Sequence, residues 1–465
     1  MKTYGLEKRV VGRWLRALFL VFFLGLACLA TKAQTPAPLQ ADYGDAGLRD
    51  WVQPEYPEAA KKAKLEGRVI VQFVVGPDGK VTQAEVRDST NETFNEAALA
   101  AVRRWTFSPA LEETKPVASG MEAPVVFHLA QLRQKAMPIA PPDGQMPQAL
   151  KLTPAKFKNA PDPEYPPELE EQKLPGEVQI EFTVDVDGKP RAPRVLWASH
   201  AAFVASALRA LANTQFEPAR QGLLAKPMKM QYPVEFESAG ARTPEILEAN
   251  HITRVAETSP EALPTPYALV EPVYPREHLL AGERGAATVE FALTAKGRTT
   301  DVMLMTATAP EYGAALLAAV EAWGFKAGGG DGTFGSSRYR VVFEFAPPSD
   351  GTVARLAEAL QPGGAGVAGP AGLDQKLKPV WRGFPAYPAA LLKEQLRGTA
   401  EIEFIIDREG RVRLPRIKSA TREEFGWAAA TAISQWVFEP PTRKGEPADV
   451  TVSIPVNFTP PKPAS

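Results

Sequence analysis

The sequence predicts an α+β fold built as four tandem small two-layer domains, each a three-stranded antiparallel sheet packed by two helices. The main observation is a repeat: a Tyr-Pro pair occurs four times, and a glycine follows each tyrosine at one fixed spacing. Beyond that glycine come a phenylalanine, a second glycine and two further phenylalanines, again at spacings that do not change between the four occurrences. These positions are Tyr56, Tyr165, Tyr274 and Tyr387; Gly67, Gly176, Gly285 and Gly398; Phe73, Phe182, Phe291 and Phe404; Gly79, Gly188, Gly297 and Gly410; Phe107, Phe216, Phe325 and Phe438; Phe127, Phe236, Phe345 and Phe458. Spacings kept four times indicate one repeated domain, and we number its copies one to four along the chain.

Strands are predicted by the alternation of apolar and polar residues after the first glycine of each copy. In copy two, Val178, Ile180, Phe182 and Val184 alternate with polar residues, as in a strand with one buried and one wet face. A two-residue hairpin signal ends each such strand, for example Asp78-Gly79 in copy one. A second strand is expected to return antiparallel over residues 81–86, and a last strand over 125–129 completes the sheet.

Helices are predicted before the first strand and after the hairpin. The proline of the Tyr-Pro pair opens a short helix, clearest over residues 57–65, because a missing N–H is tolerated at the first helical position. A longer helix is expected over residues 94–104 of copy one, with its apolar side chains on one face. Both helices are therefore expected to cover one face of the sheet.

Domain limits are predicted near residues 51–130, 157–238, 266–346 and 377–459. Copy three is the most degenerate, with Ala327 where the other copies have proline. Segments rich in proline, alanine and glycine at 138–155 and 361–373 are typical of linkers that let neighbouring copies act semi-independently. Residues 353–360 are expected to form a short helix between copies three and four.

The N-terminal segment, residues 1–33, is predicted to be a signal peptide or a signal anchor. Four basic residues at 8–16 precede an unbroken apolar run at 17–30, and small residues at 31–33 offer a cleavage site before Gln34. The run is shorter than the roughly 20 residues of a bilayer-spanning helix, which favours cleavage. A retained anchor and a lipidated Cys28 are the alternatives.

Composition excludes several classes of function. Residues 1–33 carry a net charge of +5 and the whole chain −1, so the exported part carries −6, which does not favour nucleic-acid binding. Cys28 is the only cysteine, so disulfides and thiolate chemistry are excluded from the exported part. The four histidines lack ligand spacing and no catalytic set recurs across the copies. We expect no metal, no cofactor and no enzymatic activity.

These motifs resemble the TonB C-terminal domain family. In copy one the resemblance rests on Gln53-Pro-Glu-Tyr-Pro57, Glu66-Gly-Arg-Val69, Val75-Gly-Pro-Asp-Gly79, residues 101–109 and Pro124-Val-Val-Phe127, and it extends over all four copies. The resemblance implies a periplasmic protein that binds outer-membrane transporters, or other periplasmic protein segments, by adding an extended segment of the partner to the exposed edge of its sheet. An open edge strand suits such binding, since it offers unpaired N–H and C=O groups.

On this resemblance the last strand of each copy is the expected docking edge. The implied partner-binding residues are Gln53, Val125, Val126, Phe127, Tyr232, Val234, Phe236, Val452, Ile454, Val456 and Phe458, with residues 339–345 in copy three. Gln53 matches a family glutamine that contacts the partner segment. Asp162, Glu271 and Phe384 lie near that place in the other copies, so partner preference is expected to differ between copies.

Two alternatives stay open. The family's energy transducers keep a membrane helix with a histidine that couples to inner-membrane motor proteins of the ExbB–ExbD type, whereas residues 17–30 contain no histidine. The first alternative is such an inner-membrane-anchored transducer with periplasmic domains. The second is a structural envelope scaffold without transporter binding, favoured only by the basic residues of copy four: Arg411, Arg413, Arg416 and Lys418. The recurring tyrosines and the tryptophans that follow the longer helices are interpreted as structural.

Overall fold

The computed structural model describes residues 37–38, 43–130, 141, 144–237, 240–255, 263–327, 337–347 and 350–461. The predicted signal peptide or anchor, residues 1–33, lies outside the described residues. None of the helices in the described ranges is both long and apolar enough to cross a membrane.

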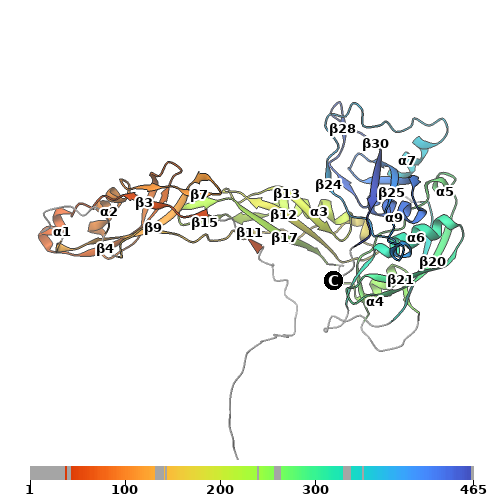
Figure 1. The fold of residues 1–465 in the computed structure, drawn as a ribbon, viewed down its shortest axis with the longest axis horizontal. Coiled ribbons are helices and arrows are strands. Elements are labelled where there is room, and N and C mark those ends of the chain that lie inside the picture. The colour runs from red at the N-terminus through yellow and green to blue at the C-terminus, as the bar shows by residue number, and fades with distance from the viewer. Residues whose placement is uncertain are drawn as a thin grey trace, which may run out of the picture. The chain divides into compact units, whose positions relative to one another are not determined.

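Copy one is an antiparallel sheet with helices on one face (Figure 1). Its central strand β4 (Gly67–Val75) pairs with β5 (Val81–Ser89) on one side and with β9 (Ser119–Phe127) on the other. The helices are α1 (Glu58–Ala63), the 3₁₀ helix η1 (Glu92–Phe94) and α2 (Asn95–Val102). Short strands complete the copy: β2 (Tyr43–Gly44), β3 (Gly47–Asp50), β6 (Thr106–Ser108), β7 (Ala110–Glu112) and β8 (Lys115–Val117). The strand β10 (Gln148–Ala149) lies in the segment that follows the copy.

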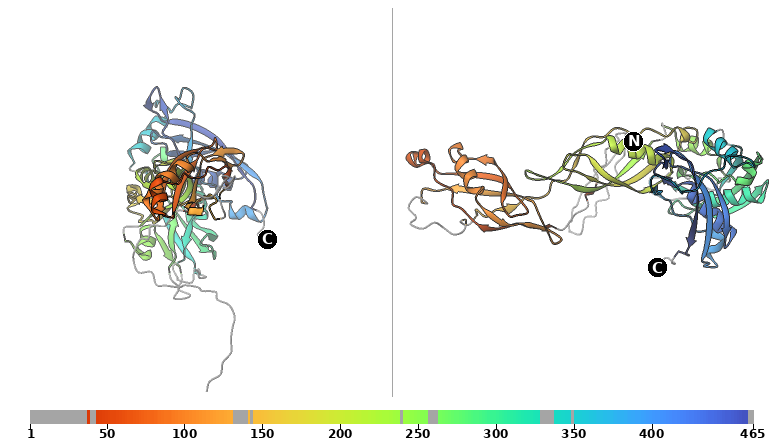
Figure 2. Two further views of the ribbon diagram at one scale, coloured as in Figure 1. Left: turned by 90° about the vertical axis from the view of Figure 1, so that its left-hand side faces the viewer. Right: turned by 90° about the horizontal axis from the view of Figure 1, so that it is seen from above.

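The same order of elements recurs along the chain. Figure 2 shows from two further sides that the later part of the chain also combines strands with helices. Copy two contains β11 (Lys156–Asn159), η3 (Pro167–Leu169), β12 (Gly176–Val184), β13 (Pro190–Ala198), α3 (Ala202–Asn213), β14 (Gln215–Glu217), β15 (Ala219–Gln221), β16 (Leu224–Lys226) and β17 (Met228–Phe236). Copy three contains β19 (Thr265–Ala268), α5 (Arg276–Leu280), β20 (Gly285–Leu293), β21 (Thr299–Ala307), α6 (Pro310–Ala322), β22 (Gly324–Lys326) and β23 (Tyr339–Phe345). Copy four contains β24 (Pro379–Trp381), α8 (Ala389–Leu392), β25 (Gly398–Ile406), β26 (Val412–Ala420), α9 (Glu423–Ser434), β27 (Val437–Phe438), β28 (Thr442–Arg443), β29 (Glu446–Pro447) and β30 (Val450–Phe458). Outside the copies lie β1 (Ala37–Pro38), α4 (Thr243–Ala249), β18 (Ile252–Arg254) and α7 (Gly351–Leu360).

The α+β prediction is confirmed, but the predicted strand number is wrong for three copies. Their central three strands are joined by a fourth, short strand that adds antiparallel outside the last one: β10 on β9, β1 on β17 and β18 on β23. These strands are two or three residues long, so they are too short to show an alternating pattern. Within the described residues the sheet of copy four keeps three strands, in the order β26-β25-β30.

Three local predictions also differ from the structure. The last strand of copy one, predicted over residues 125–129, begins earlier and ends earlier, as β9 (Ser119–Phe127). The hairpin turn is longer than two residues: in copy one Gly76 N donates to Lys80 O at 2.8 Å and Gly79 N to Gly76 O at 2.9 Å, as in a type I turn closed by a residue with positive φ. In copy two the expected first helix is only the turn η3, with Pro167 as its first residue.

The described parts of the predicted linkers are held against the copies, contrary to the semi-independence expected of them. Thr153 N donates to Arg220 O of copy two at 2.7 Å, and Thr451 N of copy four donates to Ala368 O at 3.0 Å. The helix expected over 353–360 is confirmed as α7, whose Leu356 is buried with Leu414 of copy four. One hydrophobic cluster contains residues of copies two, three and four, and copy one has a core of its own.

The repeated spacings correspond to contacts inside each copy. A Cβ on Gly67 would lie 2.7 Å from the Phe94 ring, and Phe127 stacks on that ring with 4.5 Å between centroids. Gly79 has φ +79°, its carbonyl accepts from Phe107 N at 2.8 Å, and a Cβ there would lie 2.1 Å from Phe107 O. The contact of the first glycine recurs in the other copies with Phe203, Tyr312 and Phe425 as the helix aromatic, and the hydrogen bond to the second glycine recurs at Gly188, Gly297 and Gly410. The repeat therefore specifies a core.

The recurring tyrosines and tryptophans are structural, as interpreted from the sequence. The Tyr165 hydroxyl donates to Leu174 O at 2.7 Å, and each of the other three tyrosines donates to the equivalent carbonyl of its own copy. Burial raises the pKa of Tyr165 to about 12. The indole nitrogens of Trp105, Trp323 and Trp436 donate to Val52 O, Val270 O and Gly383 O, each at 2.9 Å.

Candidate functional site

The last strand of each copy presents backbone groups away from the central strand. In an antiparallel strand the N–H and C=O of every second residue point to the same side. In copy one the outward residues are even-numbered, since Gly120 O accepts from Leu150 N at 2.9 Å and Val126 N donates to Gln145 Oε1 at 3.4 Å. The outer side of β9 is therefore occupied by the segment that follows it.

In copy four the outward residues are odd-numbered. Thr451 N donates to Ala368 O at 3.0 Å, and the register of β30 on β25 runs without a shift from residue 450 to 458. Ser453, Pro455 and Asn457 therefore also point outward, and no described strand pairs with that side of β30. Proline fits here because its missing N–H is on the open side.

The predicted strand residues fall into two groups. Five are buried core residues: Val125, Phe127, Val234, Phe236 and Phe458. Five are half-buried: Val126, Tyr232, Val452, Ile454 and Val456. The Tyr232 ring packs 4.9 Å from the Phe157 ring, and burial, followed by nearby carboxylates, raises its pKa. Only the half-buried residues have side-chain surface to offer to a partner.

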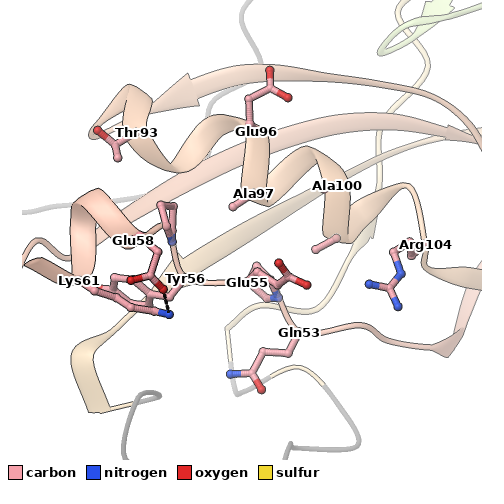
Figure 3. A pocket seen from close by; sticks show the side chains of 13 residues that line it. Gln53, Glu55, Tyr56, Glu58, Lys61, Thr93, Glu96, Ala97, Ala100 and Arg104 are labelled. Carbon is pink, nitrogen blue, oxygen red and sulfur yellow. Dashed lines mark hydrogen bonds and ion pairs between the residues drawn. The ribbon is translucent and has the colours of Figure 1, made fainter.

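Gln53 lies in a groove between the segment before α1 and the helix α2. Figure 3 shows Glu96, Ala97 and Ala100 along α2 and Arg104 just beyond its end, with Gln53 on the facing segment. The groove has a volume of about 810 Å³. Its small alanine floor and charged rim suit a polar segment of a protein more than a buried apolar ligand.

Charges around this groove are partly paired. Lys61 Nζ lies 2.5 Å from Glu58 Oε1, and this hydrogen bond lowers the pKa of the Glu58 carboxyl. Burial raises the pKa of the Tyr56 hydroxyl, with Glu66 adding to the shift. The Tyr56 and Phe127 rings meet edge to face at 5.7 Å, which connects the groove to the end of β9 through the core. Gln53 itself is not brought against the outer side of β9 by any described hydrogen bond.

Sequence reasoning missed the residues that cover the edges. These are Gln145 and the backbones of β10, β1 and β18. Gln145 and β10 lie in the predicted linker at 138–155, whereas β1 and β18 lie outside both the predicted domain limits and the predicted linkers. A proline at the same outward position in three copies, Pro124, Pro233 and Pro455, was a usable signal of an edge strand.

Comparison with known proteins matches three parts of the chain to one family. Residues 52–129, 161–238 and 384–460, together half of the chain, match the family described as Gram-negative bacterial TonB protein C-terminal. These segments are copies one, two and four. Copy three has the same central strand order in the structure.

Individual relatives are similar over short stretches. The chain is 34% identical to protein TonB of Vibrio cholerae over 101 residues, which is 22% of this chain and 41% of that one. It is 33% identical to protein TonB of Escherichia coli over 78 residues, 17% of this chain and 30% of that one. A solution NMR structure of the Pseudomonas aeruginosa TonB CTD aligns with 18% of this chain and 83% of that chain, at 30% identity and a TM-score of 0.16. The matches thus span well under half the length of these two curated relatives.

Proposed function

The chain belongs to the Gram-negative bacterial TonB protein C-terminal family, and from this premise we propose that it binds extended segments of partner proteins by adding them as strands to its sheets. The proposed partners are periplasmic segments of outer-membrane transporters. The proposed setting is the periplasm of a Gram-negative bacterium, where such binding supports transport across the outer membrane.

Strand addition inside the chain is the observation that supports this proposal most directly. In copy one, Gln148 and Ala149 of β10 pair with Glu122 and Met121 on the outer side of β9. The edges of copies two and three receive β1 and β18 in the same antiparallel way. An edge that accepts a strand from its own chain has the geometry to accept one from a partner.

The test uses the full chain and a panel of synthetic peptides from the periplasmic N-termini of the host's outer-membrane transporters. Calorimetry is expected to show binding of at least one peptide. Its backbone N-methylated form is the control, because it keeps every side chain and loses the N–H donors that a strand ladder needs. A panel without any binder, or an N-methylated peptide that binds equally well, would refute binding by strand addition.

A further inference from the structure

The four copies differ in how far the outer side of their last strand is closed by the chain itself. We propose that copy four is the receiving copy, and that its edge from Ser453 to Asn457 takes one extended partner segment with apolar residues at alternate positions. This inference rests on the proposed function and adds to it the copy, the residues and the chemistry of the partner.

Copy one is closed along most of its edge. Leu150 N donates to Gly120 O, β10 pairs with Glu122, and Val126 N donates to Gln145 Oε1. The outward residue between Glu122 and Val126 is Pro124, which has no N–H. The side chains that β9 turns toward the helices are correspondingly covered: Met121 is 1% exposed, Ala123 0% and Val125 1%. These three side chains leave no apolar surface for a partner to bury.

Copies two and three are closed in part. β1 pairs at Met230 and Gln231, and β18 pairs from Tyr339 to Val341. At the positions of Met121, Ala123 and Val125, each of these copies has two buried side chains and one that is half-buried, Tyr232 in copy two and Phe343 in copy three. In copy three the outward residues beyond β18 are Val342 and Glu344. The open stretch between them is at the short end of the usual range of strand lengths.

In copy four the closure stops at the first outward residue. Thr451 N donates to Ala368 O at 3.0 Å and its hydroxyl donates to Val367 O at 3.2 Å. Beyond it, β30 offers the N–H and C=O groups of Ser453 and Asn457 and the C=O of Pro455. This stretch, residues 453–457, is long enough for a short partner strand.

The side chains beside this open stretch define the partner. Val452, Ile454 and Val456, at the positions that are buried in copy one, are all half-buried in copy four. They pack against the core on one side, and a strand added to β30 would cover their other side. The opposite face of the sheet is polar, because Ser453 Oγ donates to Glu401 Oε1 at 2.7 Å and Lys418 Nζ lies 3.3 Å from the same oxygen. The fitting segment therefore alternates apolar and polar residues.

Proline substitution at equivalent outward positions tests the choice of copy. Asn457→Pro removes an outward N–H from a strand that already accommodates Pro455, and Asn457→Ala keeps that N–H. Glu344→Pro makes the same change at the equivalent position of copy three. With the transporter peptide that binds the full chain, we expect one peptide per chain, at least about fivefold weaker binding for Asn457→Pro, and unchanged binding for the other two variants.

Hydrogen exchange on the unmodified chain gives a second readout that does not depend on the folding of a variant. Adding the peptide is expected to slow exchange in the segment that contains Ser453 and Asn457, and not in β9. More than one peptide per chain, a loss of binding in Glu344→Pro but not in Asn457→Pro, or protection confined to another copy would overturn the inference and leave strand addition standing. A panel in which no peptide binds would instead remove the proposed function, and this inference with it.

Discussion

Replacing Gly410 by alanine should destabilise copy four more than replacing Gly445, although the two glycines have nearly the same φ, +83° and +80°. Alanine at either position is strained by roughly 1–2 kcal/mol, because an L-residue is unfavourable in this region. A Cβ on Gly445 would meet no atom within 4 Å, whereas one on Gly410 would lie 2.1 Å from Phe438 O. The backbones of β27 and the hairpin must therefore separate in Gly410→Ala only.

This separation breaks the hydrogen bond from Phe438 N to Gly410 O, which is 2.8 Å long. A net loss of about 1 kcal/mol for that bond is the minimum difference between the two variants. It corresponds to about fivefold faster exchange of the β25 amides, measured by mass spectrometry on the full chain under conditions where exchange reports the opening equilibrium. Equal exchange in the two variants would show that the close approach at this turn contributes nothing, and that only the positive φ requires glycine.

Three further results are expected. Tyr165→Phe should destabilise copy two by about 1 kcal/mol through the lost bond to Leu174 O, and calorimetry should find peptide binding unchanged; weaker binding would contradict its structural role. Burial raises the pKa of Glu321 to about 7. A folded-state pKa above the ordinary value means that the native state holds its proton more tightly, so stability should fall as pH rises from about 4.5 to about 7. Thermal unfolding across this pH range should show a smaller fall in stability for Glu321→Gln than for the unmodified chain. An equal fall in both proteins would refute this contribution of Glu321. Arg276 is 5% exposed, its Nη1 lies 2.7 Å from Glu403 Oε1 in β25, and its Nε donates to Leu414 O in β26 at 2.8 Å. Arg276→Ala should therefore speed exchange in β25 and β26; unchanged exchange in both strands would show that this contact between copies three and four is dispensable.

Much of each copy's core could be predicted because its contacts recur at fixed spacings. Gly398 needs no side chain because it lies against the Phe425 ring, and the same relation holds at the other three first glycines. Alternation likewise located β4, β12, β20 and β25, since each of these strands has one face toward the helices. The hairpin was predicted too short, because the residues that precede its glycine also belong to the turn.

The candidate site was predicted less completely. The sequence indicated which strand forms the edge, and the resemblance implied residues along it, but half of those strand residues are core. Val125 and Val456 occupy equivalent positions, yet Val125 is buried and Val456 is half-buried. The outer side of β9 is covered by the segment that follows it, whereas no described strand covers the outer side of β30.

Repetition along the chain was therefore sufficient to predict the fold class, the order of strands and helices in a copy and the structural role of its recurring aromatics. Those properties depend on side-chain contacts that lie within a single copy and occur four times. The availability of each edge depends on tertiary structure. Backbone pairing with β10 covers the edge of copy one, and pairing with β1 and β18 covers part of the edges of copies two and three. Such bonds require no particular side chains and leave no pattern in the sequence. Among the four described edges, β30 keeps the longest open row of outward N–H and C=O groups, beside three half-buried apolar side chains, because the chain's own contact with it ends at Thr451.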